Sequence, residues 1–274
     1  MSLKSITYCL VLFLLIACKD DAVEELSCDQ VLFGVPNINT GLSPEVCKQI
    51  CDCKGYEPRV FSEGEIASLK QWELTIPFPE LTTDPYKSDL PEVASGVCAV
   101  IIDNVDEKKY HLQSFPNEAA ATAAGAILTH DGPCNLCSTL QDLSVYLEFR
   151  DLGTIVRNCS FQNLLSPIGQ LVDCLEGIGF STPCAQIWAY NAKNTQQKCW
   201  EPCIEAILSE VLFNVIIPYN NEDGSLSPCI ECDELISGPI FKAYAGRTRR
   251  NSGIPSGICR FCDGVVPIAH DYPF

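Results

Sequence analysis

The sequence predicts a mainly α-helical, disulfide-rich globular protein that carries one small β-hairpin. Of its 274 residues, 47% are hydrophobic and 19% are charged, a balance typical of a chain that folds around a substantial core. Beyond residue 137 the apolar residues recur mostly at helical spacing, whereas two short runs near residue 100 have the pattern of strands. Sixteen of the 18 cysteines lie beyond Cys18. These three observations together predict the fold class.

Residues 1–17 are typical of a secretory signal peptide. They carry a single charge, Lys4, followed by an apolar run from Tyr8 to Ala17. That run is too short to span a bilayer as a helix, which needs about 20 apolar residues. Export would place the sixteen remaining cysteines in an oxidising compartment. In that setting an even set of cysteines indicates a disulfide framework.

The end of this leader, Leu15-Ile16-Ala17-Cys18, resembles the lipobox of bacterial lipoproteins. The resemblance implies cleavage before Cys18 and acylation of that cysteine, with palmitate among the expected acyl chains. Lys19-Asp20-Asp21 is similar to the tether that sends some Gram-negative lipoproteins to the outer face of the outer membrane. We therefore expect a lipid-anchored protein of the cell envelope, at the outer membrane or the cell surface. The alternative is an ordinary signal peptide cut nearby, with Cys18 free to pair.

The chain is strongly acidic. Cleavage before Cys18 would remove Lys4 and no acid, leaving 17 basic against 35 acidic residues and a net charge of −18. Such a body is repelled by phosphate backbones, so we exclude nucleic acid as a partner. The chain is long enough to bury one large core or two modest ones.

Two helix-start signals lie between residues 43 and 91. Ser43-Pro44 combines a cap with proline at the first helical position and predicts a short helix through residue 51. Ser62-Glu63-Gly64-Glu65 has the capping-box pattern and predicts a helix through Trp72.

Four prolines between residues 75 and 91 indicate a loop, which we take as a domain boundary. The expected parts are a signal peptide over residues 1–17, a lipidated tether over 18–42, a small cysteine-containing helical module over 43–91, and a main cysteine-rich, mostly helical domain over 92–274.

The β-hairpin is predicted from residues 97–103 and 109–115, which flank an acidic turn. Asn117 then caps an alanine-rich helix that runs to Ala124, and a short apolar run follows at residues 126–129. Beyond that point the pattern is helical. We expect helices over about 137–149, from Ser166-Pro167 through Ile178 with a stop at Gly177 and Gly179, from Thr182-Pro183, over 195–214 with a bend or restart at Pro202, and over 229–245 with a break at Gly238-Pro239.

One cysteine pair has the form of a redox motif. The residues His130-Asp131-Gly132-Pro133-Cys134-Asn135-Leu136-Cys137 follow an apolar run and precede a helix, and the first thiolate of a Cys-x-x-Cys pair is stabilised at a helix N-terminus. This segment is similar to the motif of thioredoxin-like proteins and to the DxxCxxC signature of the DCC thiol-disulfide oxidoreductases. The resemblance implies Cys134 as the attacking thiolate, Cys137 as the resolving thiol, and His130 or Asp131 as a tuning group. The alternative is that both cysteines form structural bridges.

Other cysteine spacings allow stapling or metal binding. Cys199 and Cys203, like Cys47 and Cys51, are four apart, so on a helix both thiols face the same neighbour. Their candidate partners are Cys98, Cys159, Cys174 and Cys184. The two knuckles Cys229/Cys232 and Cys259/Cys262 could instead supply four thiolates to zinc or Cu(I). Apart from these metals, no cofactor is expected.

The only concentration of basic residues is Arg247-Thr248-Arg249-Arg250-Asn251. We expect Arg247, Arg249, Arg250 and Asn251 to bind a small anionic ligand, an acidic partner or a glycan, because guanidinium groups recognise carboxylate and phosphate. Internal ion pairing with the many acids is the alternative. An aromatic pocket is conceivable from Trp188, Tyr190, Asn191 and Trp200, although helical spacing favours core packing for them.

The leading hypothesis is therefore a lipid-anchored binding protein whose partners are the membrane, through its anchor, and a small anionic ligand or an envelope protein. The second hypothesis is a thiol-disulfide oxidoreductase, which is the activity we expect if the chain is an enzyme at all. The third is a soft-metal binder. No motif of a hydrolytic enzyme or phosphate-binding loop is present in the sequence.

Overall fold

The computed structural model describes residues 42, 53, 58–92, 94–213, 217–260, 262 and 265–273. The predicted signal peptide, the lipidation site Cys18, the tether and the helix through residue 51 lie outside these residues. Among the described helices, none combines the length and the apolar character needed to cross a bilayer.

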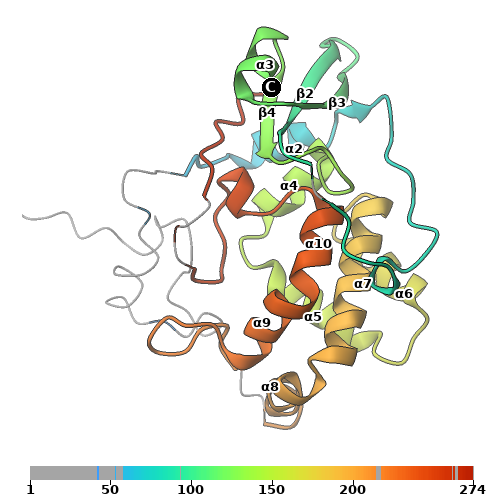
Figure 1. The fold of residues 1–274 in the computed structure, drawn as a ribbon, viewed down its shortest axis with the longest axis vertical. Helices are drawn as coiled ribbons and strands as arrows, with labels where there is room; N and C mark the ends of the chain where they lie inside the picture. The colour runs from blue at the N-terminus through green and yellow to red at the C-terminus, as the bar shows by residue number, and fades with distance from the viewer. Residues whose placement is uncertain are drawn as a thin grey trace, which may run out of the picture.

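A four-stranded sheet forms one end of the molecule (Figure 1). The hairpin prediction is confirmed, since β2 (Val97–Asn104) and β3 (Lys109–Phe115) pair antiparallel from Val97↔Phe115 to Asn104↔Lys109. The predicted apolar run becomes β4 (Ile127–Asp131), which pairs antiparallel with the other edge of β2. A two-residue strand, β1 (Glu73–Leu74), pairs parallel with β3, so the strand order is β1-β3-β2-β4.

Local capping signals start two short helices beside the sheet. In α2 (Glu63–Leu69) the Ser62 hydroxyl accepts from the Glu65 N–H, and the Glu65 carboxylate accepts from the Ser62 N–H, which is the predicted capping box. The helix ends at Leu69, three residues before the predicted end. In α3 (Glu118–Ala123) the Asn117 side chain accepts from the Ala120 N–H at 2.9 Å, as predicted.

The rest of the described chain is mainly helical, as predicted, and extends away from the sheet in Figure 1. Its elements are η2 (Pro85–Lys87), α4 (Leu140–Glu148), α5 (Leu152–Gln162), α6 (Ile168–Gly177), α7 (Thr182–Lys198), α8 (Trp200–Phe213), α9 (Pro228–Cys232), a π-helix (Asp233–Ser237), α10 (Gly238–Ala245) and η4 (Arg250–Ser252). α7 and α10 lie side by side, and α8 crosses the end opposite the sheet.

Three features of these helices differ from expectation. α5 was not predicted, although Asp151 caps it by accepting from the Thr154 N–H at 3.1 Å. The restart before α8 falls at Cys199 and not at Pro202, because proline is tolerated in the first turn of a helix, where its missing N–H has no partner. The expected break at Gly238-Pro239 is instead a π-helix, in which the Gly238 N–H donates to Asp233 O, five residues back.

One buried core joins the sheet to the helices. Leu69 and Trp72, which precede the proline-rich loop, share a hydrophobic cluster with Val100 and Tyr110 of the sheet and with Leu143 of α4. The division between residues 43–91 and 92–274 stays a prediction.

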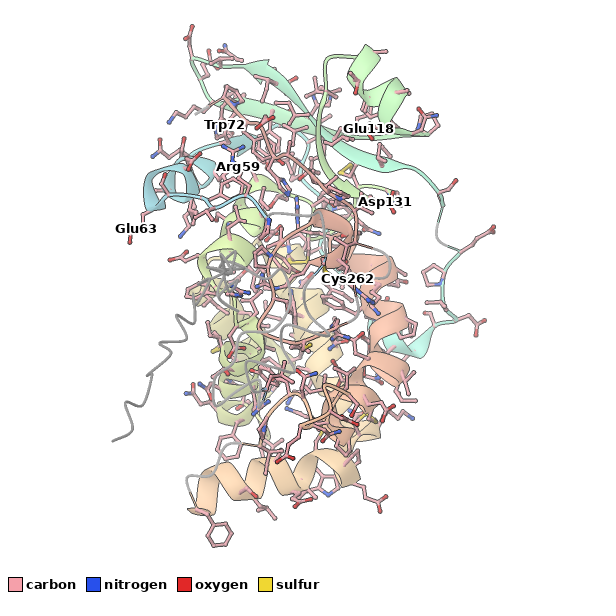
Figure 2. All side chains as sticks on the ribbon, turned by 90° about the vertical axis from the view of Figure 1, so that its left-hand side faces the viewer. Arg59, Glu63, Trp72, Glu118, Asp131 and Cys262 are labelled. Atoms are coloured by element: carbon pink, nitrogen blue, oxygen red, sulfur yellow. A yellow bond between two sulfur atoms is a disulfide. The ribbon has the colours of Figure 1, made fainter. Side chains whose placement is uncertain are left out.

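A single arginine ties the C-terminal segment to α2. Arg59 donates to the Glu65 carboxylate at 2.9 Å, to the Asp271 carboxylate at 2.8 Å and to the His270 carbonyl at 2.8 Å. Figure 2 shows Arg59, which precedes α2, on the side of this helix that faces the body of the molecule, whereas Glu63, the first residue of α2, points outward. The last residues are therefore fastened at the sheet end of the molecule.

Six disulfides link the described residues, which confirms the disulfide-rich class. They are Cys53–Cys262, Cys98–Cys134, Cys137–Cys184, Cys159–Cys174, Cys199–Cys232 and Cys203–Cys229. Cys199 and Cys203 do face one neighbour, as their spacing predicts. That neighbour is α9, through Cys232 and Cys229, and not any of the four partners proposed from the sequence.

Candidate functional site

A cavity of about 500 Å³ lies between α5, α7, α8 and the continuous segment from α9 to α10. Its walls are predominantly apolar and include six aromatic side chains: Tyr146, Phe161, Trp188, Trp200, Tyr219 and Phe241. Its volume is within the range of small-molecule sites, which are typically about 300–1,000 Å³. Size and lining together fit an organic ligand.

Positive charge gathers in this cavity. Six cationic side chains line it, namely Arg150, Arg157, Arg249, Arg250, Arg260 and Lys242, against three acidic ones, Asp151, Asp233 and Glu234. Five of the seven arginines in the chain are therefore at this one site, although the chain as a whole carries a formal charge of −17. Low-dielectric walls strengthen such a local field, so the cavity favours anions.

Aromatic rings form a continuous wall from α4 to α10. The Trp188 ring lies 4.6 Å from the Phe241 ring in an edge-on contact, and 6.4 Å from the Tyr146 ring. The Phe180 ring stacks on the Trp188 ring, with 6.0 Å between the two ring centres. The Arg249 guanidinium lies 5.4 Å from the centre of the Tyr146 ring, a cation–π distance. The wall thus offers flat apolar surface next to a cation.

Several buried polar atoms of the cavity lining make no hydrogen bond of normal geometry among the described residues, and three of them belong to uncharged side chains. They are the Tyr146 hydroxyl, the Trp188 indole N–H and the Ser160 hydroxyl, and all three atoms are buried. Burial raises the pKa of Tyr146 to about 12, and the nearby Trp188 indole acts in the opposite direction, so the hydroxyl stays protonated at neutral pH. Because buried donors are normally satisfied, these groups can accommodate acceptor atoms of a ligand.

Two of the cavity cations converge on one acid. Arg260 donates from Nη2 to Glu234 Oε1 at 2.6 Å, and Lys242 donates from Nζ to Glu234 Oε2 at 3.0 Å. Burial raises the pKa of Glu234, and the two cations outweigh it, so the net shift is downward and the carboxylate stays ionised. The neighbouring Asp233 is different, because burial raises its pKa and its partners are the neutral side chains of Thr195 and Asn191.

Two disulfides brace this end of the site. Cys203–Cys229 lies in the cavity lining, and Cys199–Cys232 joins the same two segments one helical turn away. Each bridge is expected to stabilise the fold by about 2–4 kcal/mol, chiefly by constraining the unfolded chain. The double staple keeps the start of α8 against α9 and so limits how far the cavity can open there.

The predicted ligand-binding cluster is divided by the fold. Arg249 and Arg250 line the cavity, whereas Arg247 and Asn251 are not among its lining residues. Arg247 is fully buried and donates four hydrogen bonds: to the carbonyls of Thr129, Cys137 and Ser138 and to the Thr129 hydroxyl. Asn251 bridges Thr248, Asp131 and Gly246. These two side chains hold loops together, and neither of them lines the cavity.

Arg249 lines the cavity while also capping a helix end. It donates from Nη1 to Tyr146 O at 2.9 Å, and it also donates to the carbonyls of Phe149 and Pro255. The first two acceptors are at the C-terminal end of α4, where carbonyls lack helical partners. Burial lowers the pKa of Arg249 to about 10, so the guanidinium remains charged at neutral pH. Its charge reaches the cavity although most of its donors are occupied.

The aromatic pocket considered from the sequence is present in part. Trp188, Asn191 and Trp200 line the cavity, and Tyr190 does not. The lining residues that the sequence did not single out come mainly from α5 and include Phe241 and Glu234. The helical spacing of Leu152, Val156 and Cys159 would have revealed α5, but not which neighbour it faces.

The motif residues of the redox hypothesis are placed in structural contacts. Cys134 is bridged to Cys98 and Cys137 to Cys184, so the two thiols are not paired with each other, as a Cys-x-x-Cys redox centre requires. Asp131 is exposed at the end of β4. The cysteines instead fasten the loop after β4 to β2 and to α7.

His130 is fully buried beside this motif. Its Nδ1 lies 2.8 Å from the Asp131 carbonyl, which can only accept, so Nδ1 carries the proton and Nε2 accepts from the Ser138 hydroxyl at 2.7 Å. Burial, reinforced by the charge of Arg247, holds the pKa of His130 well below its usual range. The imidazole is neutral and enclosed, and it serves the hydrogen-bond network of the core.

The four cysteines of the metal hypothesis are all in disulfides. Cys229 and Cys232 are bridged to Cys203 and Cys199, Cys262 is bridged to Cys53, and Cys259 is also disulfide-bonded. Among the residues that the structure describes, no three or more histidine, cysteine or acidic side chains are grouped as metal ligands. Zinc or Cu(I) would need reduced thiolates, which these bridges do not provide.

Comparison with known proteins gives one match. A family of unknown function (DUF8771) matches residues 168–268, which is less than half of the chain. No curated protein and no solved structure matches. The matched segment runs from α6 to the C-terminal loops and includes the cavity wall formed by α7, α8, α9 and α10. The α4–α5 side of the cavity lies outside it.

Proposed function

We propose that this chain is a lipid-anchored binding protein of the cell envelope, and that the cavity beside α7 holds a small organic anion with an aromatic or apolar body. The observation that carries the proposal is the concentration of five of the seven arginines around a wall of aromatic rings. Guanidinium groups recognise carboxylates and related anions, and flat rings favour a flat apolar partner.

The unsatisfied donors add a second requirement on the ligand. A molecule that reaches Trp188 and Tyr146 gains hydrogen bonds if it carries an oxygen or nitrogen acceptor apart from its charged group. An aromatic acid with a hydroxyl, carbonyl or ether group offers the anionic group, the flat apolar body and the separate acceptor atom. A nucleic acid does not, because the outer surface of the chain is acidic.

The lipid anchor rests on the leader and on Cys18, which the sequence places before a charged tether. Acylation would hold the body at a membrane while leaving the cavity in the aqueous phase. A tethered binding protein of this kind collects its ligand at the surface of the cell.

Two fluorescent probes test the proposal on the mature chain, purified without reductant. Anilinonaphthalene sulfonate carries an anionic group, and phenylnaphthylamine is the same fluorophore without it. We expect both to bind and to quench tryptophan emission, with the sulfonate bound more tightly at low salt than at high salt. Equal affinity of the two probes at all salt concentrations would contradict the proposed preference for anions.

A cavity-filling variant locates the binding. Ala192 is 9% exposed and lines the cavity, so Ala192→Phe should abolish binding of both probes. The same substitution at Ala119, which is exposed on α3, should leave binding unchanged. If Ala192→Phe stays folded and binds both probes as before, the cavity is not the site.

A further inference from the structure

The Glu234 carboxylate accepts hydrogen bonds from two cations of the cavity, Lys242 and Arg260. We infer that Lys242 and Arg260 form the anion seat of the cavity and that Glu234 is an internal competitor for it. The seat therefore selects ligands whose single carboxylate or sulfonate displaces Glu234. This inference rests on the proposed function, because it concerns the same cavity.

The geometry of the three side chains supports a seat for one carboxylate. Each oxygen of Glu234 takes one cation, with Oε1 2.6 Å from Arg260 Nη2 and Oε2 3.0 Å from Lys242 Nζ. The cations come from different elements, Lys242 from α10 and Arg260 from the C-terminal segment, and all three residues line the cavity. Two cations that fit one carboxylate from the protein also fit one from a ligand.

Charge decides whether Glu234 and a ligand anion can share this seat. The three side chains together carry one net positive charge while Glu234 is in place. A second carboxylate bound to the same two cations would lie close to the first, and two like charges at contact distance in a partly buried place repel each other strongly. Asp233, the residue before Glu234, also lines the cavity, and the charge of Glu234 is one of the causes that raise the pKa of Asp233. The incoming anion must therefore move Glu234 aside.

The position of Glu234 allows that movement. Its side chain is 25% exposed, and the side chains of Lys242 and Arg260 are 51% and 16% exposed. A glutamate can leave its partners by rotation about its own side-chain bonds, with no change in the backbone. It lies in the π-helix, and the two residues that follow it, Leu235 and Ile236, are 68% and 51% exposed. Turns of this type recur at functional sites in proteins.

Three variants separate competition from other effects. Glu234→Gln removes the competing charge, and we expect the affinity for anilinonaphthalene sulfonate to rise about three- to tenfold, with phenylnaphthylamine unchanged. Glu234→Asp keeps the charge on a side chain one methylene shorter, which cannot reach both cations, so the sulfonate affinity should also rise. Glu231→Gln is the matched control, because this exposed glutamate of α9 lies outside the cavity lining.

The outcomes differ clearly. If the affinity for the sulfonate rises in Glu234→Gln but not in Glu234→Asp, the glutamate acts only through its electrostatic field. If either variant loses affinity for both probes, the glutamate has a structural role. Either outcome overturns the inference. Lys242→Gln removes a half-exposed cation of the seat and should weaken only the anionic probe. If the parent protein binds neither probe in the cavity, the proposed function itself fails. If the parent protein binds both probes there, and Glu234→Gln, Glu234→Asp and Glu231→Gln all have the same probe affinities, only this inference fails.

Discussion

Two of the four hydrogen bonds that Arg247 donates go to Thr129, from Nη1 to the carbonyl at 3.0 Å and from Nη2 to the hydroxyl at 2.6 Å. The pair joins the loop after α10 to β4 across 118 residues of sequence. Both residues are completely buried. The most basic segment of the chain is thus partly a structural element of the core.

Replacing this guanidinium should therefore lower the free energy of unfolding strongly. Arg247→Met leaves the carbonyls of Thr129, Cys137 and Ser138 without their donor, and we expect a loss of about 3 kcal/mol or more in the free energy of unfolding. Denaturant unfolding without reductant measures it. Lys70→Met, which removes a half-exposed ion pair with Glu148, should cost at most about 1 kcal/mol. Equal losses in both variants would contradict the structural role of Arg247.

Stability should fall as the pH is lowered below 6.5. Burial lowers the pKa of His270 to about 3 and holds that of His130 well below 6.5, so only the unfolded chain takes up these protons as the pH drops. Each histidine then contributes a loss of up to about 1.4 kcal/mol per pH unit.

Asp142 acts in the opposite direction over part of this range. Burial raises its pKa to about 6 from an ordinary 3.8, so between these two values the folded state binds the extra proton and is stabilised by acid. Asp233, whose pKa burial also raises, acts in the same direction as Asp142, so the net loss on acidification should be smaller than the two histidines alone would give. Unfolding measured at several pH values checks this, and His130→Gln should flatten the slope. A slope that is unchanged by His130→Gln would show that this histidine is not held neutral.

Disulfide mapping should link Cys134 to Cys98 and Cys137 to Cys184. Proteolysis of the unreduced mature protein followed by mass spectrometry detects the linked peptides. Because the two thiols are in separate bridges, Cys137→Ser should trap no mixed disulfide on Cys134. A direct Cys134–Cys137 link, or a trapped partner, would restore the thiol-disulfide oxidoreductase hypothesis.

Labelled palmitate should be incorporated into the protein through Cys18. Cys18→Ser should abolish labelling and release the protein from the membrane fraction, because the lipobox cysteine is the acylated residue in bacterial lipoproteins. Cys9→Ser changes the other cysteine of residues 1–18 and should leave labelling intact. Absence of label from the unaltered protein would show that the leader is an ordinary signal peptide, and label retained in Cys18→Ser would place the acyl chain on another residue.

The sequence by itself determined the features that depend on near neighbours. The capping box of Ser62, the cap at Asn117 and the helix opened at Thr182-Pro183 all act within one helical turn, and the hairpin depends on two runs that are only a short turn apart. The number of cysteines and the signal-peptide pattern of residues 1–17 likewise predicted a disulfide-rich class without reference to any contact.

Only the tertiary structure decided which residues meet. Disulfide partners lie between 15 and 209 residues apart, and spacing along the chain does not specify such approaches. The same is true of the basic cluster, where Arg247 turns into the core and Arg249 toward the cavity, two residues apart. The cavity combines α4 and α5 with loops a hundred residues later. Its chemistry arises because packing brings these distant charges and rings to one place.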